Sequence, residues 1–182
     1  MNEPTRIVIT GFMGAGKTTV ARALAARLKC AMLDLDDFIA TREGRTPQQI
    51  IDTDGEPRFR EVETEALRAA LNHNAARVIA LGGGAWTVEE NRALIEQYGC
   101  LSVWLDAPFA LCWSRIASSD AERPLARSRD GAQKLYGKRR MIYQLAALRV
   151  AADEGRSAAE VAAELAAAAV GQLSRNQDGR EG

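Results

Sequence analysis

The stretch TGFMGAGKTTV at residues 10–20 places three glycines, a lysine and two further threonines directly after the apolar residues 7–9. Glycine weakens both strands and helices, so this density indicates a demand on backbone geometry. Residues 11–18 satisfy the pattern G-x-x-x-x-G-K-S/T, which between a strand and a helix is typical of a Walker A phosphate-binding loop. A chance glycine turn is the alternative, and the full match in this context argues against it. The stretch therefore predicts an α/β fold that binds a nucleoside triphosphate.

Each residue type in this loop has a physical role. Glycines let consecutive backbone N–H groups turn inward around phosphates, and the helix starting near Lys17 adds the positive end of its dipole. Lys17 would reach the β- and γ-phosphates, and Thr18 would ligate Mg²⁺. The nucleotide-binding residues that we expect here are Gly14, Ala15, Gly16, Lys17, Thr18 and Thr19.

The composition is that of one globular domain. The chain has 182 residues, of which 47% are hydrophobic and 26% charged. Its 24 basic and 24 acidic residues balance, so no global field favours a nucleic-acid backbone or an anionic membrane. No basic segment leads into an apolar one at the N-terminus, and no uncharged span approaches the roughly 20 residues that a bilayer requires. We expect a cytoplasmic monomer with neither nucleic-acid nor membrane partners.

Cysteine and histidine chemistry is disfavoured. The three cysteines lie in apolar stretches without C-x-x-C spacing, as reduced buried thiols do in cytosolic folds. The single histidine, His73, lies in the loop-like segment NHNAAR with nothing to orient it. A cysteine nucleophile and a histidine- or cysteine-based metal site are therefore both poor hypotheses.

Short β-rich runs alternate with helical patterns along the chain. The predicted strands are residues 6–10, 30–34, 78–81, 101–106 and about 148–150. This alternation is typical of a parallel sheet covered by helices. Thr87 with Glu90 and Ser157 with Glu160 have the spacing of capping boxes that would open two helices. We expect one domain over residues 1–173 and a disordered polar tail over residues 174–182.

Two aspartates mark the carboxyl end of the second predicted strand, in the run CAMLDLDDFI. Alternation along a strand would place Asp34 and Asp36 on the same side, facing the phosphate loop. One carboxylate could then hold Mg²⁺ through water, and the other could accept the proton of an attacking hydroxyl. N-capping of a helix by Asp36 or Asp37 is the alternative.

Three glycines end the third predicted strand, in the run LGGGAW. Gly82, Gly83 and Gly84 would let a ligand lie against bare backbone. A tight strand-to-helix turn explains the same glycines equally well. The sequence leaves both interpretations open.

Arginines supply the remaining candidates. The forked guanidinium groups of Arg60, Arg123 and Arg139 suit carboxylates and phosphates, although any single one could be a solvated surface residue. Residues 123–140 are strongly basic, which indicates a flap near phosphates. A nucleic-acid patch also fits this run, but Tyr136 is its only aromatic residue, and interleaved aromatic residues are typical of such patches.

Taken together, these motifs resemble those of the shikimate kinase family. The segments GFMGAGKTT, DLDDFI, GEPRFREVE, LGGGAW, VWLDAP, RPLA and RRMIY occur in the family's order across about residues 5–170. The resemblance implies a three-layer α/β/α P-loop fold with a five-stranded parallel sheet in the order 2-3-1-4-5 and a mobile lid over about residues 118–134. It also implies phosphorylation of the 3-hydroxyl of shikimate by ATP with Mg²⁺, a step toward chorismate and aromatic amino acids.

The resemblance further assigns roles to individual residues. The residues that would bind shikimate are Asp36, Arg60, Gly83 and Arg139, with both arginines on its carboxylate. Asp36 would also be the base. Arg123 would be the lid arginine, and Asp34 the outer partner of Mg²⁺. The adenine would lie between Arg115 and a later loop, from which Arg156 could reach its other face.

Two other functions stay open from the sequence. A kinase for another small hydroxy acid, such as gluconate, would need the same carboxylate clamp and base. The type of reaction, phosphoryl transfer to a hydroxyl group, would then be the same. A catalytically idle ATP-binding regulator is disfavoured, because the residues for chemistry are intact. These residues are Lys17, Asp34, Asp36 and Arg123. A GTPase would need a guanine-selecting N-K-x-D segment, which the sequence lacks.

Overall fold

The computed structural model describes residues 5–73, 76–119 and 128–178. Within them, five parallel strands form one sheet in the order β2-β3-β1-β4-β5, as predicted. The strands are β1 (Ile7–Thr10), β2 (Met32–Asp34), β3 (Val78–Ala80), β4 (Leu101–Asp106) and β5 (Leu148–Ala151). Each coincides with a strand expected from the sequence.

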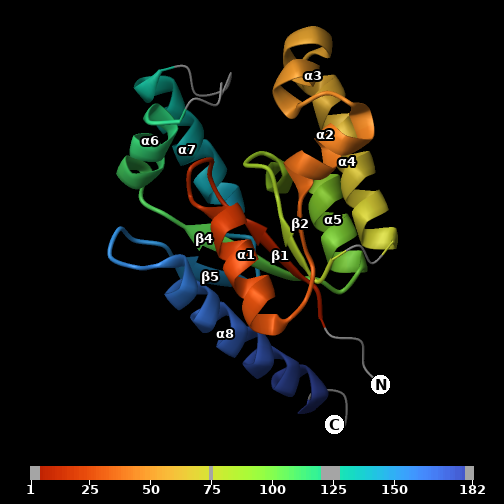
Figure 1. Cartoon of the computed structure of the whole chain (residues 1–182), viewed down its shortest axis with the longest axis vertical. Helices are drawn as coiled ribbons and strands as arrows, with labels where there is room; N and C mark the ends of the chain where they lie inside the picture. Colours follow the sequence, from red (N-terminus) through yellow and green to blue (C-terminus); the bar gives the residue numbers. More distant parts are fainter. Residues whose placement is uncertain (1–4, 74–75, 120–127, 179–182) are drawn as a thin grey trace.

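Helices fill every connection between the strands. The connections contain α1 (Lys17–Leu28), α2 (Leu35–Glu43), α3 (Pro47–Asp54), α4 (Glu56–Asn72), α5 (Glu89–Gln97), α6 (Phe109–Ala117) and α7 (Arg129–Tyr143), with a 3₁₀ turn η1 at Ala85–Thr87. The last helix, α8 (Ala158–Asp178), follows β5. Crossovers between parallel strands are right-handed, so the direction in which a connection crosses the sheet decides which face its helix covers. The β1–β2 connection crosses the sheet toward the β2 edge, and the other three connections cross it toward the β5 edge. This difference places α1 on one face of the sheet and α4, α5 and α7 on the other. Helix α8 packs beside α1, which completes a three-layer α/β/α fold (Figure 1).

The core lies along the central strands. Every residue of β1 and β4 is buried, because helices cover both faces of the sheet. The segments that follow β1, β2 and β3 at their carboxyl ends are the phosphate loop, α2 and a turn of three glycines. Open parallel sheets bind ligands at this edge, so the fold places the predicted motifs where a ligand site is expected.

One of the two predicted capping boxes is present. The Ser157 hydroxyl accepts a hydrogen bond from the Glu160 backbone N–H, and the Glu160 carboxylate accepts one from the Ser157 backbone N–H. The capping box predicted for Thr87 and Glu90 is wrong. The Thr87 hydroxyl instead donates to the Gly84 carbonyl oxygen at 2.6 Å, because η1 intervenes, and α5 begins later, at Glu89.

The ends of two predicted segments also differ from expectation. Helix α8 continues to Asp178, so residues 174–178 are helical and not disordered, because an established helix gains one hydrogen bond for each residue added. Residues 179–182 lie outside the described residues. The lid expected over about residues 118–134 falls partly on residues 120–127, which also lie outside them, while residues 129–134 belong to α7. No helix in the described part of the chain is both long and apolar enough to cross a bilayer.

Candidate active site

A cavity of about 490 Å³ opens at the carboxyl ends of β1, β2 and β3. Of the residues predicted from the sequence, its lining brings together Gly14, Gly16, Lys17, Thr18, Thr19, Asp34, Asp36, Arg60, Gly82, Gly83, Gly84, Arg115 and Arg139. Two predicted residues in the described part of the chain do not line it: Ala15 is buried, and Arg156 bonds to the Ala151 carbonyl and the Glu164 carboxylate. Arg123 lies outside the described residues.

The phosphate loop follows β1 and wraps against α6. Gly14 has a φ of 78°, and a Cβ at this position would lie 2.6 Å from the Cys112 carbonyl oxygen, so only glycine fits. The Lys17 ammonium donates to the Phe12 carbonyl oxygen at 2.9 Å, and the Arg115 guanidinium donates to the Gly14 carbonyl oxygen at 3.1 Å. Two cations therefore lie against the loop whose N–H groups would surround phosphates.

Asp34 joins the phosphate loop to α2. Its carboxylate accepts a hydrogen bond from the Thr18 hydroxyl at 2.5 Å and caps α2 by accepting from the Asp36 and Asp37 backbone N–H groups. An aspartate therefore does cap this helix, as the sequence alternative proposed, but it is Asp34 and not Asp36 or Asp37. A hydroxyl and a carboxylate in contact beside a phosphate loop form an oxygen ligand set of the type that Mg²⁺ prefers.

Asp36 lines the cavity for a different reason from the one predicted. Strand β2 ends at Asp34, so Asp36 lies in the first turn of α2 and does not share a strand face with Asp34. Burial, and then the charge of Asp34, raise the pKa of the Asp36 carboxyl, while Lys17 opposes the shift. A carboxyl group with a raised pKa is a stronger base once it is ionised.

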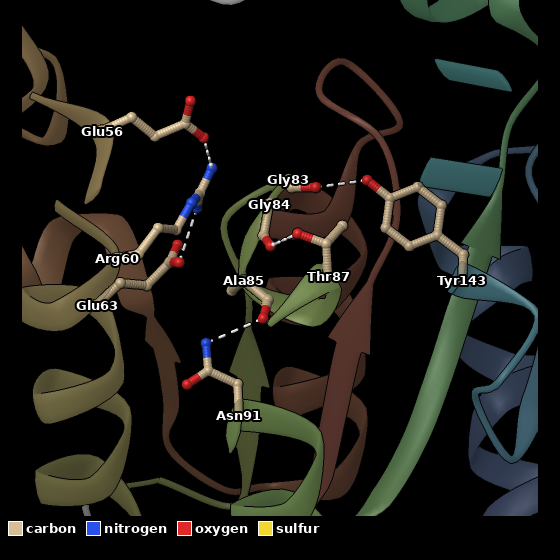
Figure 2. Close-up of polar contacts among 9 residues, drawn as sticks. All are labelled: Glu56, Arg60, Glu63, Gly83, Gly84, Ala85, Thr87, Asn91 and Tyr143. Carbon is tan, nitrogen blue, oxygen red and sulfur yellow. Dashed lines mark hydrogen bonds and ion pairs between the residues drawn. The ribbon is translucent and has the colours of Figure 1, made fainter. Parts of the chain in front are cut away.

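Two glutamates of α4 hold the guanidinium of Arg60. Its Nη1 lies 2.8 Å from Glu63 Oε2, and its Nη2 lies 2.8 Å from Glu56 Oε1 (Figure 2). Burial disfavours the charged form, but Glu63 and Glu56 outweigh it and raise the pKa of Arg60. The guanidinium is therefore fixed and charged at the cavity wall.

Glu63 is a site residue that the sequence reasoning missed. Its side chain is 1% exposed, and its Oε1 atom has no hydrogen-bond partner among the described residues. Burial raises the pKa of the Glu63 carboxyl to about 7, although the charge of Arg60 opposes this shift. The signal was present in the sequence, because Glu63 follows Arg60 at the i,i+3 spacing that brings helix side chains together.

Arg139 is the second arginine of the cavity wall. It is only 6% exposed, and within the described residues it forms no ion pair. Burial lowers the pKa of the Arg139 guanidinium, while the neighbouring Tyr143 hydroxyl opposes the shift. A buried guanidinium without a carboxylate is costly unless an anion completes its coordination, so this position favours an anionic ligand.

The three glycines form the turn between β3 and η1, and the turn lies close to both arginines. A Cβ on Gly84 would lie 2.2 Å from Arg60 Nη2, and a Cβ on Gly83 would lie 3.6 Å from Arg139 Nη1. A Cβ on Gly82 would lie 2.7 Å from Asp36 Oδ1. A Cβ at Gly82 or Gly84 would therefore displace a charged side chain of the cavity, a reason for glycine that neither sequence interpretation contained.

The cavity has the features of a phosphotransfer site. Lys17 and the phosphate loop lie in one part of its lining, and Arg60, Arg139 and the glycine turn lie in another, with Asp34 and Asp36 also in the lining. The chain matches the family model described as shikimate kinase over residues 13–169. The chain belongs to the shikimate kinase family.

Similar proteins agree with this membership. A shikimate kinase of Geobacter sulfurreducens is 41% identical over 168 residues, which are 91% of this chain and 91% of that protein. A solved structure named as shikimate kinase from Acinetobacter baumannii in complex with shikimate is 32% identical, with a TM-score of 0.79 and coverage of 94% of both chains. Membership in the shikimate kinase family makes this chain a small-molecule kinase and implies a nucleotide substrate.

The gluconate alternative is represented among the solved structures. A gluconokinase from Sinorhizobium meliloti is 18% identical, with a TM-score of 0.58 and coverage of 100% of both chains. At this identity the likeness shows the fold alone. Shikimate kinases and this gluconokinase therefore share an architecture, and the residues of the acceptor pocket must distinguish them.

Proposed function

We propose that this protein is a shikimate kinase that transfers the γ-phosphoryl group of ATP to the 3-hydroxyl of shikimate. The observation that carries the proposal is the buried Arg139, which has no carboxylate partner among the described residues and lines the same cavity as Arg60 and the phosphate loop. Two guanidinium groups in the lining of one cavity suit the carboxylate of a small acid. The curated relatives named shikimate kinase and the shikimate complex of the relative from A. baumannii favour shikimate as that acid.

The nucleotide would bind through the phosphate loop. The N–H groups of the loop, Lys17 and the amino end of α1 would hold the phosphates, as in other Walker A loops. Arg115, which already bonds to the loop at Gly14, would lie against the adenine. Arg123 lies outside the described residues, and its role on the transferring phosphate, like the lid that would carry it, stays a prediction.

The residues around Thr18 fit Mg²⁺. The Thr18 hydroxyl would be a direct ligand, and Asp34 would act through a water molecule. No cluster of three or more histidine, cysteine, aspartate or glutamate side chains that could hold a metal occurs among the described residues, so the protein would supply few ligands itself. This is the usual situation for Mg²⁺, which keeps several waters and takes oxygens from the substrate phosphates. When bound, the ion would neutralise charge on the β- and γ-phosphates.

Asp36 would act as the base. The proton of the 3-hydroxyl would pass to the Asp36 carboxylate as the hydroxyl oxygen forms its bond to the γ-phosphorus and the bond to the β–γ bridging oxygen breaks. Lys17 would stabilise the charge that develops on the departing ADP. Arg60, Arg139 and the backbone of Gly83 would orient the acceptor.

A coupled assay of ADP release tests the function directly. We expect rapid turnover with shikimate and near-background rates with gluconate or without an acceptor. Turnover with gluconate but not with shikimate would favour the alternative acid, and ATP binding without turnover on either would favour the regulatory alternative. We also propose, from the composition and the motifs of the sequence, that the protein is a cytoplasmic monomer. Light scattering tests the monomer.

A further inference from the structure

Three successive backbone carbonyls, of Gly83 and Gly84 in the glycine turn and of Ala85 at the start of η1, accept hydrogen bonds from side chains. The Thr87 hydroxyl donates to the Gly84 oxygen at 2.6 Å, and the Asn91 amide donates to the Ala85 oxygen at 2.9 Å (Figure 2). Both donors follow the turn closely in sequence. The third donor is the Tyr143 hydroxyl, which bonds to the Gly83 oxygen at 2.5 Å and comes from the last residue of α7.

The Tyr143 bond fixes more than one atom of the turn. A trans peptide unit is planar, so holding the Gly83 carbonyl also holds the N–H of Gly84, which points the opposite way. Figure 2 shows Tyr143 and Arg60 on opposite sides of the turn, so this N–H is directed to the side on which Arg60 lies. Glycine has the widest choice of backbone conformations, and a run of three glycines therefore needs such external contacts to hold one geometry.

The same tyrosine neighbours the acceptor-binding arginine of α7. Tyr143 is 1% exposed and lies one helical turn after Arg139. Burial raises the pKa of the Tyr143 phenol, while the charge and hydrogen bonding of Arg139 oppose this shift. The hydroxyl is thus protonated at neutral pH and able to donate to Gly83. A second bond joins α7 to η1, which directly follows the turn: the Trp86 indole N–H donates to the Ile142 carbonyl oxygen at 3.0 Å.

We propose that Tyr143 is a positioning residue that holds the glycine turn and Arg139 in a fixed relative position for binding the acceptor. It does so without touching the acceptor, by joining α7, which carries Arg139, to the backbone of Gly83. The inference rests on the proposed function, since it assumes that the turn and Arg139 contact the same small acid.

The test compares two tyrosines of the same helix. Tyr143→Phe keeps the buried ring and removes only the donor to Gly83. The matched control is Tyr136→Phe, because the Tyr136 hydroxyl donates to the Ala107 carbonyl oxygen at 2.9 Å, away from the glycine turn. Steady-state kinetics and calorimetric binding give KM and Kd for shikimate and for ATP in the wild type and both variants.

We expect Tyr143→Phe to raise KM and Kd for shikimate about fivefold to tenfold, the effect of one buried hydrogen bond, while the KM for ATP changes less than about twofold. Tyr136→Phe should lower thermal stability without a selective effect on shikimate. Amide exchange at residues 83–85 should be faster in Tyr143→Phe than in the control. The proposal is overturned if the ratio of shikimate affinity to ATP affinity is the same in both variants.

Two further outcomes separate the possible failures. If the wild type neither binds nor phosphorylates shikimate, the proposed function is wrong; if it does both and Tyr143→Phe is unaffected, only the role of Tyr143 is wrong. Should Tyr143→Phe not yield folded protein, Trp86→Phe removes the neighbouring bond to α7. It should then show the same selective rise in shikimate KM, and an unchanged affinity ratio in Trp86→Phe would overturn the proposal.

Discussion

Gly84 lies directly against the guanidinium of Arg60, so closely that a Cβ on Gly84 would come within 2.2 Å of Arg60 Nη2. Arg60 cannot retreat freely, because Glu56 and Glu63 hold its two terminal nitrogens at 2.8 Å each. The glycine therefore makes room for an arginine whose position α4 dictates. This relationship connects the glycine turn to the acceptor pocket through sterics alone.

Gly84→Ala should displace Arg60 and weaken shikimate binding at least about tenfold, the effect of losing a charge-assisted hydrogen bond. ATP binding should change little, because the phosphate loop is not involved. The matched control is Gly137→Ala in α7, where a Cβ would meet nothing within 4 Å. That variant should stabilise the protein by about 0.5–1 kcal/mol, because glycine is a poor residue for a helix interior. Calorimetric titration of both ligands and thermal unfolding check the pair; unchanged shikimate affinity in Gly84→Ala would refute the steric argument.

Asp36→Asn should lower kcat by about 10²–10⁴-fold, the usual contribution of a general base, while keeping the shape of the side chain. Lys17→Ala should also lower kcat, through lost charge stabilisation in the transition state. The control is Asp37→Asn, the exposed neighbour of Asp36, which should keep near-wild-type turnover. Single-turnover rates at saturating substrates are the measurement, and a fast Asp36→Asn enzyme would show that this aspartate is not the base.

Arg139→Ala and Arg60→Ala should each weaken acceptor binding by about 1.5–3 kcal/mol, the range for hydrogen bonds to charged groups. Lys138→Ala, at the exposed neighbouring position of α7, should leave acceptor binding unchanged. Equilibrium titration with shikimate and with ATP distinguishes the two sites. The carboxylate clamp would be the wrong assignment if either arginine variant lost ATP affinity and kept shikimate affinity.

Glu63 should make stability fall as pH rises through a defined window. The pKa of its carboxyl is about 7 in the folded protein against an ordinary value near 4.5, so between these values the folded state retains a proton that the unfolded state has lost. The contribution is complete below about pH 4.5 and is lost above about pH 7, with a size on the order of 3 kcal/mol.

Glu63→Gln isolates this effect from that of Asp36, whose pKa is raised in the same direction. The variant should gain stability relative to the wild type as pH increases from about 5 to 8, in denaturant unfolding at each pH. A stability difference that stays constant over this range would mean that Glu63 is ionised throughout.

GTP should replace ATP with a loss on the order of tenfold in kcat/KM, or about 1.4 kcal/mol. Arg115 can stack on any purine, and in the structure Arg156 is already engaged by Glu164 and does not line the cavity. Phosphate and Mg²⁺ contacts should therefore dominate nucleotide affinity. Rates with both nucleotides at saturating shikimate are the check, and a preference for ATP of about a thousandfold would require backbone groups that read the adenine edge.

Local patterns were sufficient for the strands and the phosphate loop but not for the order of the strands in the sheet. The five strands and the phosphate loop could be predicted because alternation of strand and helix, and glycine spacing before Lys17, are properties of neighbouring residues. The strand order came from resemblance to the family. The predictions that depended on exact element boundaries were less successful: Asp36 belongs to a helix and not to a strand, and Thr87 closes a 3₁₀ turn and does not cap a helix.

The amino-acid sequence by itself determined which chemical groups are available: a phosphate loop, two aspartates around the end of the second strand, three glycines and a set of arginines. Only the tertiary structure decided how these groups combine. It pairs Arg60 with Glu63, gives Arg139 no carboxylate partner among the described residues, and brings Tyr143 to Gly83 across 60 positions of sequence. The physical reason is that burial sets the free-energy cost of a charged group and its need for an oppositely charged or hydrogen-bonding partner. Burial in turn depends on how elements that are distant in sequence pack against one another.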